Sequence, residues 1–94
     1  MQPFVYILAS RPNGTLYIGV TSDLAKRMAQ HRSGAMPGFT KRHGVTRLVY
    51  FEAHSSMEEA IRRERQMKEW HRAWKLRLIE QGNPQWRDLF ETIL

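Results

Sequence analysis

Two short apolar segments joined by a turn signal constrain the fold of this chain more than any other feature. Residues 4–9 and 15–20 are rich in β-branched and aromatic side chains, and the Asn13-Gly14 pair between them is favoured in tight turns. We therefore predict a β-hairpin over residues 4–20. Strands joined by a hairpin pair antiparallel, so the pattern excludes an all-parallel sheet.

The remainder of the chain alternates helical patterns with one further strand. Residues 34–44 mix glycines, small residues and bases, which is typical of a surface loop. The order strand, strand, helix, strand, helix, helix predicts an α+β fold with a small antiparallel or mixed sheet covered by helices. The further expected elements are a helix over residues 24–32, a strand over 46–53, a helix from Ser56 to about Glu69, a helix over 72–81 and a short helical turn within 86–94.

Length and charge narrow the class of protein. With 94 residues the chain has apolar side chains for one core, so we expect a single domain over residues 1–94. The formal charge of +6 predicts attraction to polyanions, with nucleic acid the first partner to test. The absence of Cys excludes disulfides and thiolate zinc sites, and no apolar run is long enough for a membrane span. We expect a cytoplasmic protein.

Two polar residues lie beside the apolar stripe of the first predicted helix. Advancing 100° per residue brings Arg27 and His31 to the face that carries Leu24 and Met28. Both are candidate functional residues. The alternative is structural, because an Arg often lays its stem along an apolar edge and a lone His is often a packing residue.

The second predicted helix carries a carboxylate in its apolar stripe. Glu64 lies at the centre of this stripe, where an unpaired charge would be costly to desolvate. Such an acid is usually paired, bound to a metal ion, or directed into a cleft. Pairing with Lys68 one turn later is the structural alternative, worth only about 0.2–0.5 kcal/mol on an open helix. The apolar members of the stripe are Met57, Ala60, Ile61 and Met67.

Two tyrosines share a face of the predicted hairpin. A two-residue turn at Asn13-Gly14 places Tyr6 and Tyr17 on the same face as Gly19, offset by four residues or roughly 13 Å. The sequence leaves open whether the two hydroxyl groups converge, or whether both rings are ordinary packing residues of the sheet.

A basic stretch with interleaved indoles follows Glu64. Its Lys and Arg side chains can bind along a nucleic-acid backbone. Alternatively, they form a solvated face while Trp70, Trp74 and Leu78 pack the helix onto the core. We favour packing for the Trp residues. A third hypothesis makes residues 62–77 a groove-reading DNA-binding region, in which case the tyrosines have no role.

The ordered set Tyr6, Tyr17-Ile18-Gly19, Arg27, His31, Glu64 and Asn83 resembles the GIY-YIG nuclease domain family, particularly its short single-domain bacterial members. Phe4-Val5-Tyr6 stands at the first tripeptide of that family and Tyr17-Ile18-Gly19 at the second. The match covers nearly the whole chain. The resemblance implies a three-stranded antiparallel sheet flanked by helices.

The same resemblance implies hydrolysis of DNA with one divalent metal ion, Mg²⁺ or Mn²⁺. Glu64 would be the metal ligand, Tyr17 or Tyr6 would act as or orient the general base, and Arg27 would neutralise charge on the phosphate. His31 stands at a position held by His or Tyr. Phe4 replaces the first Gly of the family and Val20 stands where some repair nucleases have Lys, so the mechanism of those enzymes is not carried over.

Two functions follow from these observations. The first is a metal-dependent endonuclease acting on DNA rather than RNA, either structure-directed or weakly sequence-specific. The second is a binding module of the same fold that does not cut. An acid facing a polyanion favours the enzyme, because binding gains from it only when a cation lies between them. The expected catalytic residues are Tyr6, Tyr17, Arg27, His31 and Glu64, and the expected nucleic-acid contacts are Gly19, Lys41, Arg42, Arg63, Lys68 and Asn83.

Overall fold

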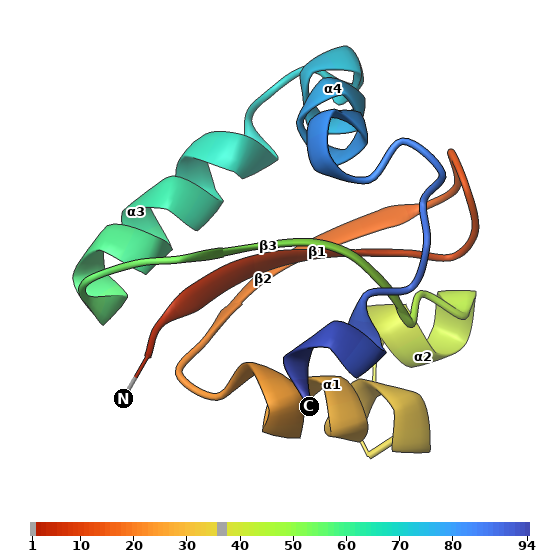
Figure 1. Ribbon diagram of the computed structural model, residues 1–94, viewed down its shortest axis with the longest axis horizontal. Coiled ribbons are helices and arrows are strands. Elements are labelled where there is room, and N and C mark those ends of the chain that lie inside the picture. The colour runs from red at the N-terminus through yellow and green to blue at the C-terminus, as the bar shows by residue number, and fades with distance from the viewer. Residues whose placement is uncertain (1, 36–37) are drawn as a thin grey trace.

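The computed structural model describes residues 2–35 and 38–94 (Figure 1). The predicted strands and the three longer predicted helices are present, with ends shifted by a residue or so. The elements in chain order are β1 (Phe4–Ala9), β2 (Leu16–Thr21), α1 (Leu24–Ser33), α2 (Phe39–His43), β3 (Arg47–Ala53), α3 (Met57–Lys68), α4 (Arg72–Gly82) and a terminal 3-10 helix, η1 (Phe90–Ile93).

The three strands form one antiparallel sheet in the order β2-β1-β3. This arrangement confirms the α+β class and the three-stranded antiparallel sheet. The central strand, β1, pairs on both sides and helices cover both faces of the sheet, so its side chains from Val5 to Ala9 are buried. Any side chain on β1 is therefore held in a fixed position by the sheet.

The loop of the β1–β2 hairpin differs from the prediction. The backbone N–H of Gly14 donates to the carbonyl of Arg11 at 2.9 Å, and the N–H of Ser10 donates to the carbonyl of Thr15 at 3.0 Å. The loop therefore spans four residues, 11–14, with Asn13 at a φ of 58°. The predicted two-residue turn is wrong, and the strand register changes with it.

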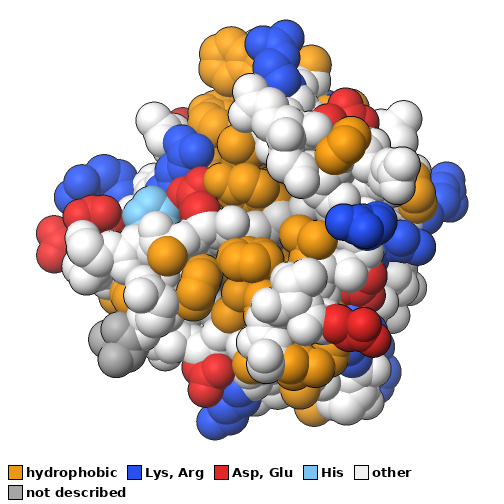
Figure 2. All heavy atoms as spheres, viewed as in Figure 1, with side chains coloured by type: hydrophobic (Ala, Val, Ile, Leu, Met, Phe, Trp, Pro, Cys, Tyr) orange, Lys and Arg blue, Asp and Glu red, His pale blue; other side chains and the backbone are white. Residues whose placement is uncertain are grey.

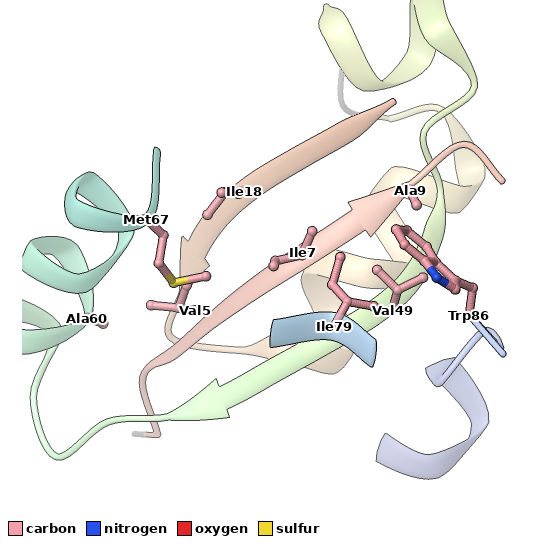
Figure 3. Packing of buried hydrophobic residues seen from close by; sticks show 9 residues of the cluster. All are labelled: Val5, Ile7, Ala9, Ile18, Val49, Ala60, Met67, Ile79 and Trp86. Atoms are coloured by element: carbon pink, nitrogen blue, oxygen red, sulfur yellow. The ribbon is translucent and has the colours of Figure 1, made fainter. Parts of the chain in front are cut away.

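Helices cover both faces of the sheet, with α3 and α4 on one side and α1, α2 and η1 on the other (Figure 1). Each face has its own apolar cluster. The cluster beneath α3 and α4 consists of Val5, Ile7, Ala9, Ile18, Val49, Ala60, Met67, Ile79 and Trp86 (Figure 3). The cluster beneath α1 consists of Tyr6, Leu8, Leu24, Met28, Val45 and Leu48.

Side-chain caps fix the starts of the two helices that carry candidate site residues. The Asp23 carboxylate accepts from the backbone N–H of Lys26 at 3.1 Å at the start of α1. The Ser56 hydroxyl accepts from the N–H of Glu59 at 3.1 Å at the start of α3. Each cap satisfies a donor that the first helical turn leaves free, and so fixes the residue at which the helix begins.

The predicted loop over residues 34–44 contains a helix, α2. It lies between Gly38, at a φ of 109°, and Gly44, at a φ of 64°, and both are conformations that glycine adopts readily. A helix this short is unstable alone and needs tertiary contacts. Thr40 supplies one, since it is buried against α1. Met36 and Pro37, part of the same predicted loop, lie outside the described residues.

One packing prediction for α4 is wrong. Trp74 is 51% exposed and contacts Trp70 edge to face at a centroid distance of 6.1 Å, so it does not hold the helix on the core. The buried residue of α4 is Ile79.

Figure 2, drawn from the same side as Figure 1, shows apolar side chains gathered in the middle of the face turned to the viewer, with Lys and Arg side chains around its rim. None of the helices formed by the described residues is long and apolar enough to cross a membrane.

Candidate functional site

The two tyrosines meet on the α1 side of the hairpin. Tyr6 on β1 faces Gly19 on β2, and Leu8 faces Tyr17, so the tyrosines lie on the same face of the sheet, two residues apart rather than four. Their ring centroids are 6.3 Å apart. The same-face prediction is confirmed and the predicted offset is wrong. The two registers differ by two residues, an even number, so the face is retained.

Gly19 permits this approach because it has no side chain. A Cβ atom at this position would lie 2.5 Å from both Cζ and the hydroxyl oxygen of Tyr6, and 3.0 Å from Cε2 of Tyr17. Carbon atoms in contact are normally about 3.5–4.0 Å apart. The Gly of the second tripeptide is therefore a packing requirement of the site, in addition to the nucleic-acid contact predicted for it.

His31 joins the tyrosines to α2. Its Nε2 atom lies 3.2 Å from the Tyr6 hydroxyl, and its Nδ1 atom lies 3.1 Å from the hydroxyl of Thr40. Its ring also packs against Tyr17 at a centroid distance of 5.8 Å. The imidazole is 4% exposed, so both ring nitrogens take their partners from within the protein. Thr40 is a site residue that sequence reasoning missed.

Burial and charge shift the acid-base behaviour of this cluster. Burial raises the pKa of the Tyr6 phenol to about 12, and the charges of Tyr17 and Glu64 raise it as well. The Arg27 guanidinium acts in the opposite direction and lowers that pKa. Burial also lowers the pKa of His31, and Arg27 lowers it further. His31 is therefore neutral at pH 7, with one nitrogen donating and the other accepting.

Arg27 lies one turn before His31 on α1 and is half-buried. Its charge acts on both Tyr6 and His31, which places the guanidinium at the tyrosine cluster. Among the residues that the structure describes, no carboxylate forms an ion pair with it. The cation is thus free to interact with an anion brought from outside.

Glu64 occupies α3 between the buried residues Ala60 and Met67, and its side chain is only 15% exposed. The Lys68 ammonium lies 3.1 Å from its carboxylate, so the predicted structural pairing is present. Lys68 itself is 52% exposed. The Glu64 charge also acts on Tyr6 across the site. Pairing with Lys68 is therefore compatible with an electrostatic effect of the same carboxylate on Tyr6.

The single carboxylate of Glu64 is compatible with a weakly bound Mg²⁺ ion. Among the described residues no group of three His, Asp, Glu or Cys side chains is placed to bind a metal ion. Mg²⁺ keeps several waters and is commonly bound by one or two carboxylates together with substrate phosphate. Glu64, a partly accessible carboxylate whose partner Lys68 is half exposed, fits that requirement.

The predicted nucleic-acid contacts fall into two groups. Lys41 and Arg42 are exposed on α2, the helix that reaches the site through Thr40. Gly19 lies within the site, and Lys68 is exposed on α3, where it pairs with Glu64. Contact of these four residues with nucleic acid stays a prediction.

The remaining two predicted contacts have partners within the protein. Arg63 donates to Glu52 at 2.9 Å and its guanidinium lies 5.0 Å from the centre of the Trp70 ring. Asn83 is buried; its amide donates to the carbonyls of Val49 and Arg87 at 3.2 and 2.8 Å and accepts from the Arg87 N–H at 2.9 Å. Both residues join α3 or the end of α4 to the sheet.

Phe39 is a second residue near the site that the sequence did not single out. Its ring is 45% exposed and lies 6.4 Å from the Tyr17 ring at an interplanar angle of 26°. Its signal in the sequence is weak, because an aromatic residue within a Gly-rich loop is common. Only the fold places it beside Tyr17.

Comparison with known proteins identifies the family to which a chain with this fold and these residues belongs. The profile of the GIY-YIG catalytic domain matches residues 2–77, and this chain belongs to the GIY-YIG family.

Individual relatives match this chain over most of their length. A UPF0213 protein of Staphylococcus haemolyticus is 40% identical over 78 residues, covering 83% of this chain and 94% of that protein. A UPF0213 protein of Staphylococcus saprophyticus is 35% identical over 79 residues, covering 84% and 95%. The solution NMR structure of the UPF0213 protein BH0048 from Bacillus halodurans is similar with a TM-score of 0.58 and 34% identity, covering 94% of this chain and 93% of that one.

Proposed function

We propose that this chain is an endonuclease that hydrolyses phosphodiester bonds in DNA with the help of one divalent metal ion, Mg²⁺ or Mn²⁺. One observation carries the proposal: Tyr6, Tyr17 and His31 converge on one face of the hairpin, and the charges of Arg27 and Glu64 both act on the Tyr6 phenol. Hydrolysis needs an activated water, positive charge near the phosphate and a route for protons, and this set contains a group for each.

Burial separates the roles of the two tyrosines. Tyr6 is fully buried with a pKa of about 12, so its hydroxyl is a poor base and serves to position His31. Tyr17 is half-buried and lies on the edge strand β2. We assign the general base, which must reach a water beside the phosphate, to Tyr17.

Arg27 supplies the permanent positive charge. A guanidinium with no carboxylate partner among the described residues can donate two parallel hydrogen bonds to phosphate oxygens. The same charge lowers the pKa of Tyr6, which places it beside the two tyrosines. Arg27 can therefore stabilise the negative charge that develops on the phosphate during hydrolysis.

Glu64 would hold the metal ion, which when bound supplies Lewis-acid polarisation of the phosphate. The carboxylate then faces a cation instead of a bare polyanion, which removes the repulsion that Glu64 would otherwise impose on DNA. The net charge of +6 supports binding to the phosphate backbone.

A non-cutting DNA-binding module is the second candidate. The Glu64–Lys68 ion pair at 3.1 Å favours it, since the acid already has a partner within the chain. An exposed lysine contributes little to such a pair, so a divalent ion would compete with it effectively.

Cleavage of labelled single-stranded, nicked, branched and duplex DNA, each with Mg²⁺, Mn²⁺ or EDTA, distinguishes the two. The endonuclease predicts shortened products with either metal and none with EDTA. Binding of these substrates with no product under any metal condition would leave the binding module as the better account.

A further inference from the structure

An exposed aromatic ring stands at the edge of the tyrosine cluster. Phe39 is 45% exposed, nearly parallel to Tyr17 and 6.4 Å from it, and the His43 ring contacts it from within α2 at 4.5 Å. Tyr17 in turn touches His31. An aromatic series therefore runs from the buried imidazole through the assigned base to a ring that faces solvent.

The exposure of Phe39 is unusual for a large apolar side chain of this protein. Among the described residues the other large apolar side chains with comparable exposure are Trp74 on α4 and Leu94 at the end of the chain, and both lie outside the tyrosine cluster. Thr40, the next residue along, already anchors α2 by its buried contact with His31. The helix is thus fixed from beneath while Phe39 presents its ring outward.

Two exposed basic residues share the short helix with Phe39. Lys41 and Arg42 lie two and three residues after Phe39 on α2. Sites for single-stranded nucleic acid combine aromatic rings that stack on bases with basic side chains that contact the backbone. Phe39, Lys41 and Arg42 form such a combination, which we call the α2 platform, beside the residue assigned to activate water.

We propose that the α2 platform stacks an unpaired nucleobase on Phe39 and thereby selects DNA with an unpaired nucleotide next to the bond that is cut. The inference rests on the proposed nuclease function. In a duplex both faces of an internal base are covered by its neighbours, so Phe39 cannot stack on it. An unpaired base in a single strand, flap or bulge has a face free.

The test measures binding separately from cutting. Affinity is determined in EDTA for a short oligothymidylate, for the same backbone with its bases removed, and for a blunt duplex. Phe39→Leu removes the aromatic face and keeps a similar apolar volume, while Phe39→Trp restores an aromatic face. Trp74→Leu, which removes an exposed ring elsewhere, is the matched control. Thermal unfolding checks that each variant folds.

Loss of one base–aromatic stack should weaken binding of the oligothymidylate by about 5-fold to 150-fold in Phe39→Leu. Binding of the base-free backbone and of the duplex should change little, Phe39→Trp should bind the oligothymidylate like the parent, and Trp74→Leu should have no effect. Equal losses for all three ligands, unchanged oligothymidylate affinity in Phe39→Leu, or failure of the folded parent to bind the oligothymidylate would overturn the proposal.

Cutting is then measured with Mg²⁺ on the same single strand. A parent protein that shows the base-dependent binding but makes no product would contradict the nuclease function and leave the stacking platform standing. A parent that cuts, with Phe39→Leu binding the oligothymidylate as tightly, would contradict the platform and leave the nuclease standing.

Discussion

Replacing Gly19 by Ala tests the packing of the candidate site most sharply. The new methyl carbon would lie 2.5 Å from two atoms of Tyr6 and 3.0 Å from Tyr17. Tyr6 cannot move aside easily, because its ring is fully buried, is carried on the central strand and has its hydroxyl 3.2 Å from His31. The clash must therefore be relieved by shifting the sheet or the tyrosine cluster.

Adding a methyl group to a packed core typically costs about 1–3 kcal/mol. For a domain of this size each kcal/mol lowers the melting temperature by about 4–8 °C. Gly19→Ala should therefore melt at least a few degrees below the parent in thermal unfolding, and its cleavage rate should fall because Tyr17 is displaced. Gly82→Ala is the matched control, since a Cβ there meets no described atom within 4 Å, and its stability should be unchanged or higher.

A double variant locates the clash. Tyr6→Phe removes one of the two Tyr6 atoms that the new carbon would meet, so Gly19→Ala with Tyr6→Phe should be less destabilised than the sum of the single variants. A Gly19→Ala protein as stable and active as the parent, or strict additivity in the double variant, would refute the described packing of the tyrosine cluster.

Three further predictions concern the chemistry. Arg27→Ala should lower the cleavage rate by about 10²-fold to 10³-fold. Lys26→Ala, on the exposed face of α1, should change the rate little. Equal losses of rate in the two variants would mean that only the total charge of the protein matters. Tyr17→Phe should lower the cleavage rate by about 10²-fold or more, because it removes the assigned general base. Tyr6→Phe should lower the free energy of unfolding by about 1 kcal/mol, because it removes a hydrogen bond. The reverse pattern in rate and unfolding measurements would exchange the roles of the two tyrosines. The pKa of His31 is lowered in the folded state, so the unfolded chain binds the proton more readily and the free energy of unfolding falls as pH drops below about 6.5. In unfolding measurements at several pH values, His31→Gln should lose this part of the pH dependence. An unchanged pH dependence would assign it to another residue.

Local patterns in the sequence predicted most of the fold. The strands and helix starts depend on neighbouring residues: Asp23 and Ser56 cap α1 and α3, because each can satisfy a free N–H within the first turn of its helix. The length of the hairpin loop was harder to predict, since Asn13-Gly14 suits both a two-residue turn and the four-residue loop that forms. The pairing of β1 with β2 has the register of the four-residue loop.

The candidate site was predictable only in part, for a related reason. The positions of Arg27, His31 and Glu64 on their helices follow from helical periodicity, and the structure places the first two at the tyrosine cluster. Thr40 and Phe39 belong to a helix that exists through contacts with distant residues. No periodicity over five residues signals such a helix, so their roles required the fold.

The central claim is that Glu64 serves metal-dependent cleavage of DNA, and one comparison tests it most directly. Cleavage rates with Mg²⁺ are measured for the parent, Glu64→Gln and Glu58→Gln, which makes the same change at an exposed position of α3. We predict that Glu64→Gln loses cleavage while its thermal stability in EDTA is unchanged or higher, and that Glu58→Gln cuts like the parent. A folded Glu64→Gln protein that cuts at the parent rate would contradict the account.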